Sequence, residues 1–145
     1  MATQLFVPAM VLVLWSLIML IWTAATRFPA IARTGVDVKN VPPGGRGQNL
    51  DGVLPDKVQW KSHNYAHLME QPTIFYATAL ALAVMGEGGS LAVNLAWGYA
   101  GLRIVHSLVQ ILSNRVVVRF LVFALASLCL LGLVLLALSI ASAQA

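Results

Sequence analysis

Charged residues are scarce in this chain. Asp, Glu, Lys and Arg make up 10% of its 145 residues, whereas a soluble globular domain contains about 25%. A soluble helical bundle needs a polar outer surface on every helix, and this composition cannot supply one. Hydrophobic residues account for 59% of the chain, and the mean hydropathy is +0.83. The composition therefore argues against a soluble domain and predicts an integral membrane protein.

Other features that are missing narrow the class further. The single cysteine, Cys129, has no intrachain partner for a disulfide, and its apolar surroundings disfavour a reactive thiolate. The few basic residues form no patch with interleaved aromatic side chains, so nothing indicates binding to nucleic acid. No basic segment precedes the first hydrophobic run, which we therefore expect to be a retained span and not a cleaved signal.

Four segments are candidates for membrane spans, each of which needs about 20 apolar residues. We expect the first span to end at Arg27 and Pro29. The second becomes strongly apolar only at Ile74, and Pro72 interrupts it, but a membrane helix tolerates a proline when the freed carbonyl finds another donor. We therefore predict a single domain over residues 1–145, an all-α integral membrane four-helix bundle. Its expected spans cover residues 5–26, 58–86, 90–112 and 116–141.

The basic residues predict the orientation of this bundle. Apart from Arg103, all of them lie near the first and third connections, whereas the termini and the second connection have no Lys or Arg. Under the positive-inside rule, the first and third connections face the cytoplasm and both termini lie outside. The polar stretch over residues 30–56 is expected to form a loop on the membrane surface. The basic residues concerned are Arg27, Arg33, Lys39, Arg46, Lys57, Lys61, Arg115 and Arg119.

Glu70 and Arg103 are charged residues that lie well inside predicted spans, where each costs about 3 kcal/mol or more at the membrane centre. Glu70 and Arg103 should therefore both face the bundle interior. At about 1.5 Å of rise per residue, antiparallel second and third spans bring them to similar depths. We predict an ion pair between these two side chains.

Further polar residues share helix faces with this pair, because they recur at helical spacing. Together they predict a basic, partly water-filled cavity that opens to the cytoplasm and suits an anionic ligand. The residues are His63, His67 and Glu70 on the second span, Arg103, His106 and Gln110 on the third, and Arg115 with Arg119 on the fourth.

Two alternatives use the same residues. The Glu70–Arg103 pair could fix helix register only, with Arg115 and Arg119 extending to lipid headgroups. His63, His67, Glu70 and His106 have a spacing compatible with a metal site built from facing helices. The neighbouring arginines disfavour a dication electrostatically, so no metal is expected.

Three motifs resemble the MAPEG family of membrane-associated proteins in eicosanoid and glutathione metabolism, which includes microsomal glutathione transferases and prostaglandin E synthase. The resemblance runs without a gap from His63 to Phe123, and the four-span layout extends it to the whole chain. It implies a homotrimer with glutathione bound between subunits on the cytoplasmic side. For a bacterial-type member, the membrane would be the inner membrane. The motifs are Glu70-x-x-x-x-Phe75, Arg103-x-x-His106 and Asn114-Arg115-x-x-x-Arg119.

The resemblance also implies roles for individual residues. Arg119 would be the catalytic residue, since a cation beside a thiol stabilises the thiolate nucleophile. The chain departs from the family in having His67 where transferases usually have an asparagine, and Gln110 and Phe123 at tyrosine positions. The glutathione-binding residues would be His67, Glu70, Arg103, His106, Gln110 and Arg115.

The implied function is that of a membrane glutathione transferase or peroxidase-like protein. It would conjugate glutathione, or a similar anionic thiol, as co-substrate to a lipophilic electrophile that enters from the bilayer. The alternative is a non-catalytic trimeric membrane protein or accessory subunit with an altered ligand site.

Overall fold

Residues 2–35 and 43–144 are described by the computed structural model, and all regular structure in these two ranges is helical. The prediction of an all-α fold is confirmed. The α-helices are α1 (Phe6–Thr34), α2 (Asp56–Leu68), α3 (Gln71–Val84), α4 (Ser90–Leu112) and α5 (Val116–Gln144), and the short 3-10 helices are η1 (Thr3–Leu5) and η3 (Gly47–Leu50).

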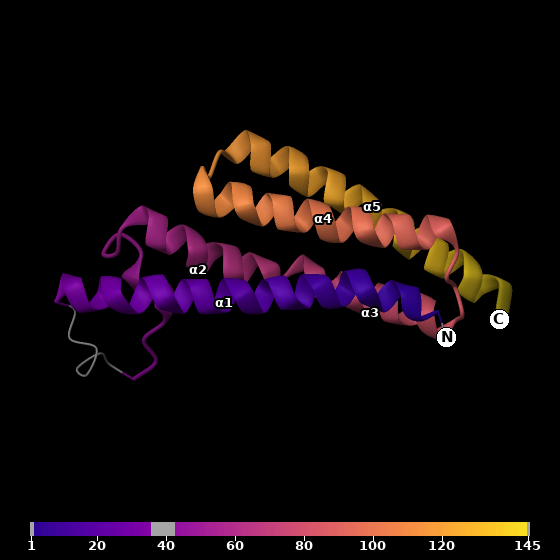
Figure 1. The fold of residues 1–145 in the computed structure, drawn as a ribbon, viewed down its shortest axis with the longest axis horizontal. Coiled ribbons are helices and arrows are strands. Elements are labelled where there is room, and N and C mark those ends of the chain that lie inside the picture. Colours follow the sequence, from indigo (N-terminus) through magenta and orange to yellow (C-terminus); the bar gives the residue numbers. More distant parts are fainter. Residues whose placement is uncertain (1, 36–42, 145) are drawn as a thin grey trace.

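The helices form an antiparallel bundle in which α2 and α3 together make the second of four long segments (Figure 1). α1 begins and α5 ends at the same end of the bundle (Figure 1). α4 packs against α1, α2 and α5, and α3 also contacts α5. Residues of α2, α4 and α5 can therefore meet in the interior.

Small residues allow α4 and α5 to approach each other closely. A Cβ atom added at Gly98 of α4 would lie 3.2 Å from the Sγ atom of Cys129 on α5. A Cβ atom added at Gly132 of α5 would lie 3.1 Å from Leu95 Cδ1. Alanines on α4, including Ala96 and Ala100, are fully buried. Such packing of small residues is typical of helices that associate within a membrane.

The outer surface is apolar, as the composition requires. Large aliphatic and aromatic side chains on α1 and α5, among them Ile21, Phe28 and Leu128, are exposed. The helical segments Thr3–Thr34 and Val116–Ala143 contain 18-residue stretches with mean hydropathies of 2.5 and 2.9 and are long enough to cross a bilayer. These features support an integral membrane protein.

The end of the first helix differs from the prediction. α1 does not stop at Arg27 and Pro29 but continues through Pro29 to Thr34. The proline removes one backbone donor, and membrane helices accommodate this loss. The helix ends instead at Gly35, whose φ of +68° is the left-handed conformation that commonly terminates helices at glycine. Lys39, one of the residues used to predict orientation, lies outside the described ranges.

The second span is not the continuous helix that the sequence predicted. Pro72 has no N–H group, and its ring clashes with the carbonyl four residues earlier, which belongs to Leu68. α2 ends at Leu68, and α3 starts at Gln71 with Pro72 in its first turn. The break leaves carbonyl groups of α2 without helical partners, and the residue at the break is Glu70.

Candidate functional site

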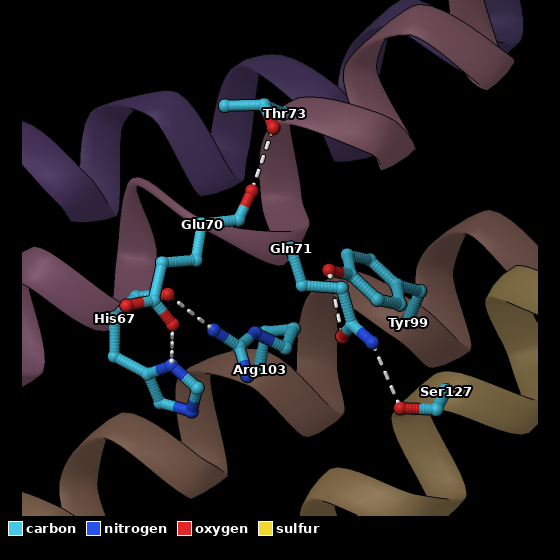
Figure 2. Close-up of polar contacts among 7 residues, drawn as sticks. All are labelled: His67, Glu70, Gln71, Thr73, Tyr99, Arg103 and Ser127. Carbon is cyan, nitrogen blue, oxygen red and sulfur yellow. Dashed lines mark hydrogen bonds and ion pairs between the residues drawn. The ribbon is translucent and has the colours of Figure 1, made fainter.

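The broken span is capped by an arginine from the neighbouring helix. Arg103 of α4 has no exposed surface, and its Nη2 atom donates a hydrogen bond of 3.0 Å to the carbonyl oxygen of His67 in the last turn of α2 (Figure 2). A cation at the carboxyl end of a helix interacts favourably with the unpaired carbonyls and the helix dipole. Arg103 therefore supplies a donor that α2 lost at the break.

The predicted ion pair between Glu70 and Arg103 is not formed. Oε2 of Glu70 lies 2.7 Å from Nδ1 of His67 instead, and the Glu70 side chain is 67% exposed. Because the helix breaks at Glu70, its carboxylate does not follow the interior face that a continuous helix would give it. Nε and Nη1 of Arg103 are buried without a hydrogen-bond partner in the described part of the chain. Guanidinium N–H groups pair strongly with carboxylates, so these two buried donors could bind an anionic group.

A cavity of about 200 Å³ lies between α2, α4 and α5; Arg103 does not line it, but its guanidinium lies over the ring of Phe123, which does. The ring of Phe123 forms its aromatic wall, stacked on His67 at 5.5 Å and beneath the guanidinium of Arg103, also at 5.5 Å. His106 meets His67 edge-on, with the ring centroids 5.1 Å apart. The cavity thus unites three of the predicted site residues, one from each of three helices. Its lining residues are His67 of α2, His106 of α4, and Val116, Arg119, Phe120 and Phe123 of α5.

The connection between α4 and α5 positions Arg119. Asn114 adopts a left-handed conformation with φ of 50°, which asparagine tolerates better than most residues, and its N–H group bonds to the Val109 carbonyl at 2.8 Å. The Asn114 side-chain oxygen accepts a hydrogen bond from Nη1 of Arg119. The half-buried guanidinium is thereby held at the cavity wall.

The other predicted site residues lie elsewhere. Gln110 is buried, with no partner for its Oε1 atom among the described residues, and it does not line the cavity. Arg115 is exposed just before α5. His63 faces Asp51, at 3.2 Å between Nε2 and Oδ1, so it does not join His67. The metal alternative loses this ligand, and the described residues contain no group of three or more potential metal ligands.

A polar network that the sequence reasoning missed joins α3, α4 and α5. Gln71 follows the break, donates to Ser127 of α5 at 2.9 Å and accepts a hydrogen bond from Tyr99 of α4 at 3.3 Å (Figure 2). A single glutamine next to a proline is a weak sequence signal and does not predict this role. The network holds the start of α3 against both neighbouring helices.

A second missed network fixes α2 to α1 and α4. The hydroxyl oxygen of Ser107 accepts hydrogen bonds from Asn64 at 2.7 Å and from the Trp15 ring nitrogen at 2.9 Å. Ser107 directly follows His106, so this contact also sets the rotation of α4 at the cavity. Buried hydroxyls on apolar helices are the only sequence signal, and they commonly have purely structural roles.

The fold and the polar interior together define a membrane-embedded helical bundle with a basic, aromatic-lined cavity. The MAPEG family model matches residues 5–139, nearly the whole chain, and the chain belongs to this family. Membership connects the chain with membrane proteins of glutathione and eicosanoid metabolism but specifies no activity. No curated protein and no solved structure matches the chain.

Proposed function

We propose that this protein binds glutathione, or a similar anionic thiol, and conjugates it to lipophilic electrophiles, as a membrane glutathione transferase or peroxidase-like enzyme. The observation that carries the proposal is the buried Arg103 guanidinium, which lies over the ring of the cavity-lining residue Phe123 and has two N–H donors without a partner among the described residues. A bound carboxylate would satisfy them with charge-assisted hydrogen bonds. Glutathione carries two carboxylates and a nucleophilic thiol, and family membership favours it over other anions.

Arg119 is the proposed catalytic residue. It lines the same cavity as His67 and His106 and is held there by Asn114. A fixed cation beside the bound thiol stabilises the thiolate. Glutathione would act as co-substrate, with its thiol near Arg119 and a carboxylate near Arg103.

The electrophile is proposed to come from the bilayer. Val116 and Phe120 border the cavity and are exposed on the outer surface of α5. A lipophilic molecule dissolved in the membrane could reach the thiol along this apolar side, while the polar co-substrate enters from the aqueous side. This arrangement favours hydrophobic substrates of low water solubility.

We further propose a homotrimer in the bacterial inner membrane, with both termini outside and the site towards the cytoplasm. Glu70 and Arg115, two of the proposed glutathione-binding residues, are exposed in the single subunit. A neighbouring subunit that covers them would complete the site. Gln110 would then contact glutathione only after moving from its buried position.

The test is the ultraviolet absorbance of the glutathione thiolate on detergent-purified protein. We expect a saturable thiolate signal with wild type, its loss in Arg119→Ala, and its retention in the matched control Arg33→Ala, which removes an exposed arginine of α1. If the wild-type protein binds no anionic thiol, the proposal is refuted.

A second candidate, a non-catalytic accessory subunit, is favoured by one observation. The cavity wall is the hydroxyl-free ring of Phe123, and Gln110 does not reach the cavity. This alternative predicts that Arg119→Ala changes no measurable property beyond a slight change in stability.

A further inference from the structure

We infer that His67, oriented by Glu70, is the general base that takes the proton from the thiol. The inference rests on the proposed function. It adds a second catalytic residue to Arg119, because an arginine cannot accept the thiol proton. Oε2 of Glu70 lies 2.7 Å from Nδ1 of His67, and the His67 ring lines the cavity (Figure 2).

A thiol that becomes a thiolate must give its proton to another group. Arg119 stabilises the product charge, but a guanidinium stays protonated in proteins and cannot accept a proton. Among the described residues that line the cavity, only His67 and His106 carry an acceptor of suitable basicity. The proton acceptor is therefore one of two histidines.

The geometry separates these two candidates. An ionised carboxylate only accepts hydrogen bonds, so contact with Glu70 assigns the ring proton of His67 to Nδ1. Nε2 then carries the free lone pair, and it makes no hydrogen bond to any residue in the described ranges. The His67 side chain is 28% exposed and lines the cavity.

His106 has neither the carboxylate contact nor the exposure of His67. It is 3% exposed, stands one helical turn from Arg103, and contacts no carboxylate in the part of the chain that the structure describes. A carboxylate beside the imidazole stabilises the imidazolium that forms on proton transfer, and only His67 has such support. His106 instead packs edge-on against His67 and helps to hold that ring in place.

The step balances without a further reactant. The S–H bond breaks, the proton passes to Nε2 of His67, and a thiolate remains beside Arg119 while the imidazolium pairs with the Glu70 carboxylate. With an epoxide as the electrophile, a C–S bond forms as a C–O bond breaks. The imidazolium then returns its proton to the alkoxide, and His67 is neutral again.

The asparagine that is usual in the family at this position supplies a test of the assignment. An asparagine at this position can bind a ligand through its amide but cannot accept a proton at neutral pH. The substitution His67→Asn therefore removes the base while it keeps a polar side chain of the family's usual type. It tests the inference with little disturbance of α2.

The experiment measures glutathione affinity, the rate of thiolate formation by stopped-flow absorbance, and conjugation to styrene oxide. In His67→Asn we expect glutathione to bind nearly as well as in wild type, while thiolate formation and conjugation slow by about 10²–10⁴-fold, the usual contribution of a general base. Glu70→Gln should slow the same steps by a smaller factor. The matched control His63→Asn, one turn earlier and facing Asp51, should behave as wild type.

A second variant guards against a purely structural explanation. His67→Gly opens space for added imidazole, which should restore part of the conjugation rate. If His67→Asn binds glutathione and forms thiolate at the wild-type rate, His67 is not the base. If wild type itself binds no thiol, the proposed function fails and this inference with it.

Discussion

At the scale of single residues, Arg103 connects the fold to the site. One of its nitrogens donates to the His67 carbonyl at the end of α2, and two others have no partner in the described ranges. The fixed fork of a guanidinium can donate in several directions at once. The same side chain can therefore stabilise the helix break and bind an anion.

Arg103→Lys separates these two tasks. A lysine keeps the charge but presents one compact ammonium group on a flexible stem, so it cannot serve both the His67 carbonyl and a ligand carboxylate with the same geometry. We expect glutathione affinity to fall by about 10-fold or more, corresponding to one lost charge-assisted hydrogen bond of about 1.5–3 kcal/mol. Isothermal titration of detergent-purified protein measures this, and wild-type affinity in the variant would contradict the role of Arg103.

At the scale of helices, two prolines in similar settings have opposite outcomes. Pro29 lies inside α1, which continues to Thr34, whereas Pro72 coincides with the break between α2 and α3. The surroundings of the two prolines differ, because Arg103 of α4 bonds to the end of α2 and Gln71 anchors the start of α3 to α5. Local sequence rules treat both prolines alike and cannot distinguish them.

Other helices follow directly from the sequence. α4 and α5 begin at Ser90 and Val116, where long apolar runs start after polar residues, and neither contains a proline. The convergence of His67, His106 and Arg119 also follows from helical spacing and antiparallel order. The partner of Glu70 does not, because it depends on the break at that residue.

Pro72→Ala tests the origin of the break. The substitution restores a backbone N–H and removes the clash with the Leu68 carbonyl, so α2 and α3 can join. We expect stability in detergent to change by about 1 kcal/mol or less, because the gain in helix opposes the loss of the Arg103 contact. Glutathione binding should weaken as His67 and Glu70 rotate. Unchanged binding, together with an unchanged circular dichroism helix signal, would mean that the proline does not cause the break.

Gly98→Leu tests the close contact of α4 with α5. A Cβ atom added there would lie 3.2 Å from Cys129 Sγ, so a larger side chain forces the helices apart and costs about 1–3 kcal/mol. Gly101→Leu is the matched control, because nothing lies within 4 Å of its Cβ position. Thermal unfolding in detergent should show a lower midpoint for the first variant only. Equal midpoints would contradict this packing.

At the scale of the whole molecule, the two ends of the bundle differ. α1 begins and α5 ends at one end, whereas α1 ends and α2 begins at the other (Figure 1). Exposed apolar side chains cover the length between them. Arg27 and Arg33 near the end of α1 and Lys57 at the start of α2 make the second end basic, and the proposed orientation places this end towards the cytoplasm.

Cysteine labelling tests that orientation. In a Cys129→Ser background, Arg46→Cys should react with a membrane-impermeant maleimide only when the cytoplasmic face is accessible. Glu87→Cys, in the turn between α3 and α4, should react from the opposite side. The reverse pattern would overturn the predicted topology and the location of the site.

The most direct test of the central claim is a calorimetric titration of the purified protein with glutathione and with a glutathione amide that lacks the glycine carboxylate. The site proposed around Arg103 and Arg119 predicts saturable binding of glutathione and markedly weaker binding of the amide, because a buried guanidinium loses its charged partner. Equal affinity for the two compounds would mean that this carboxylate does not meet a buried arginine. Absence of binding to both would contradict the glutathione site altogether.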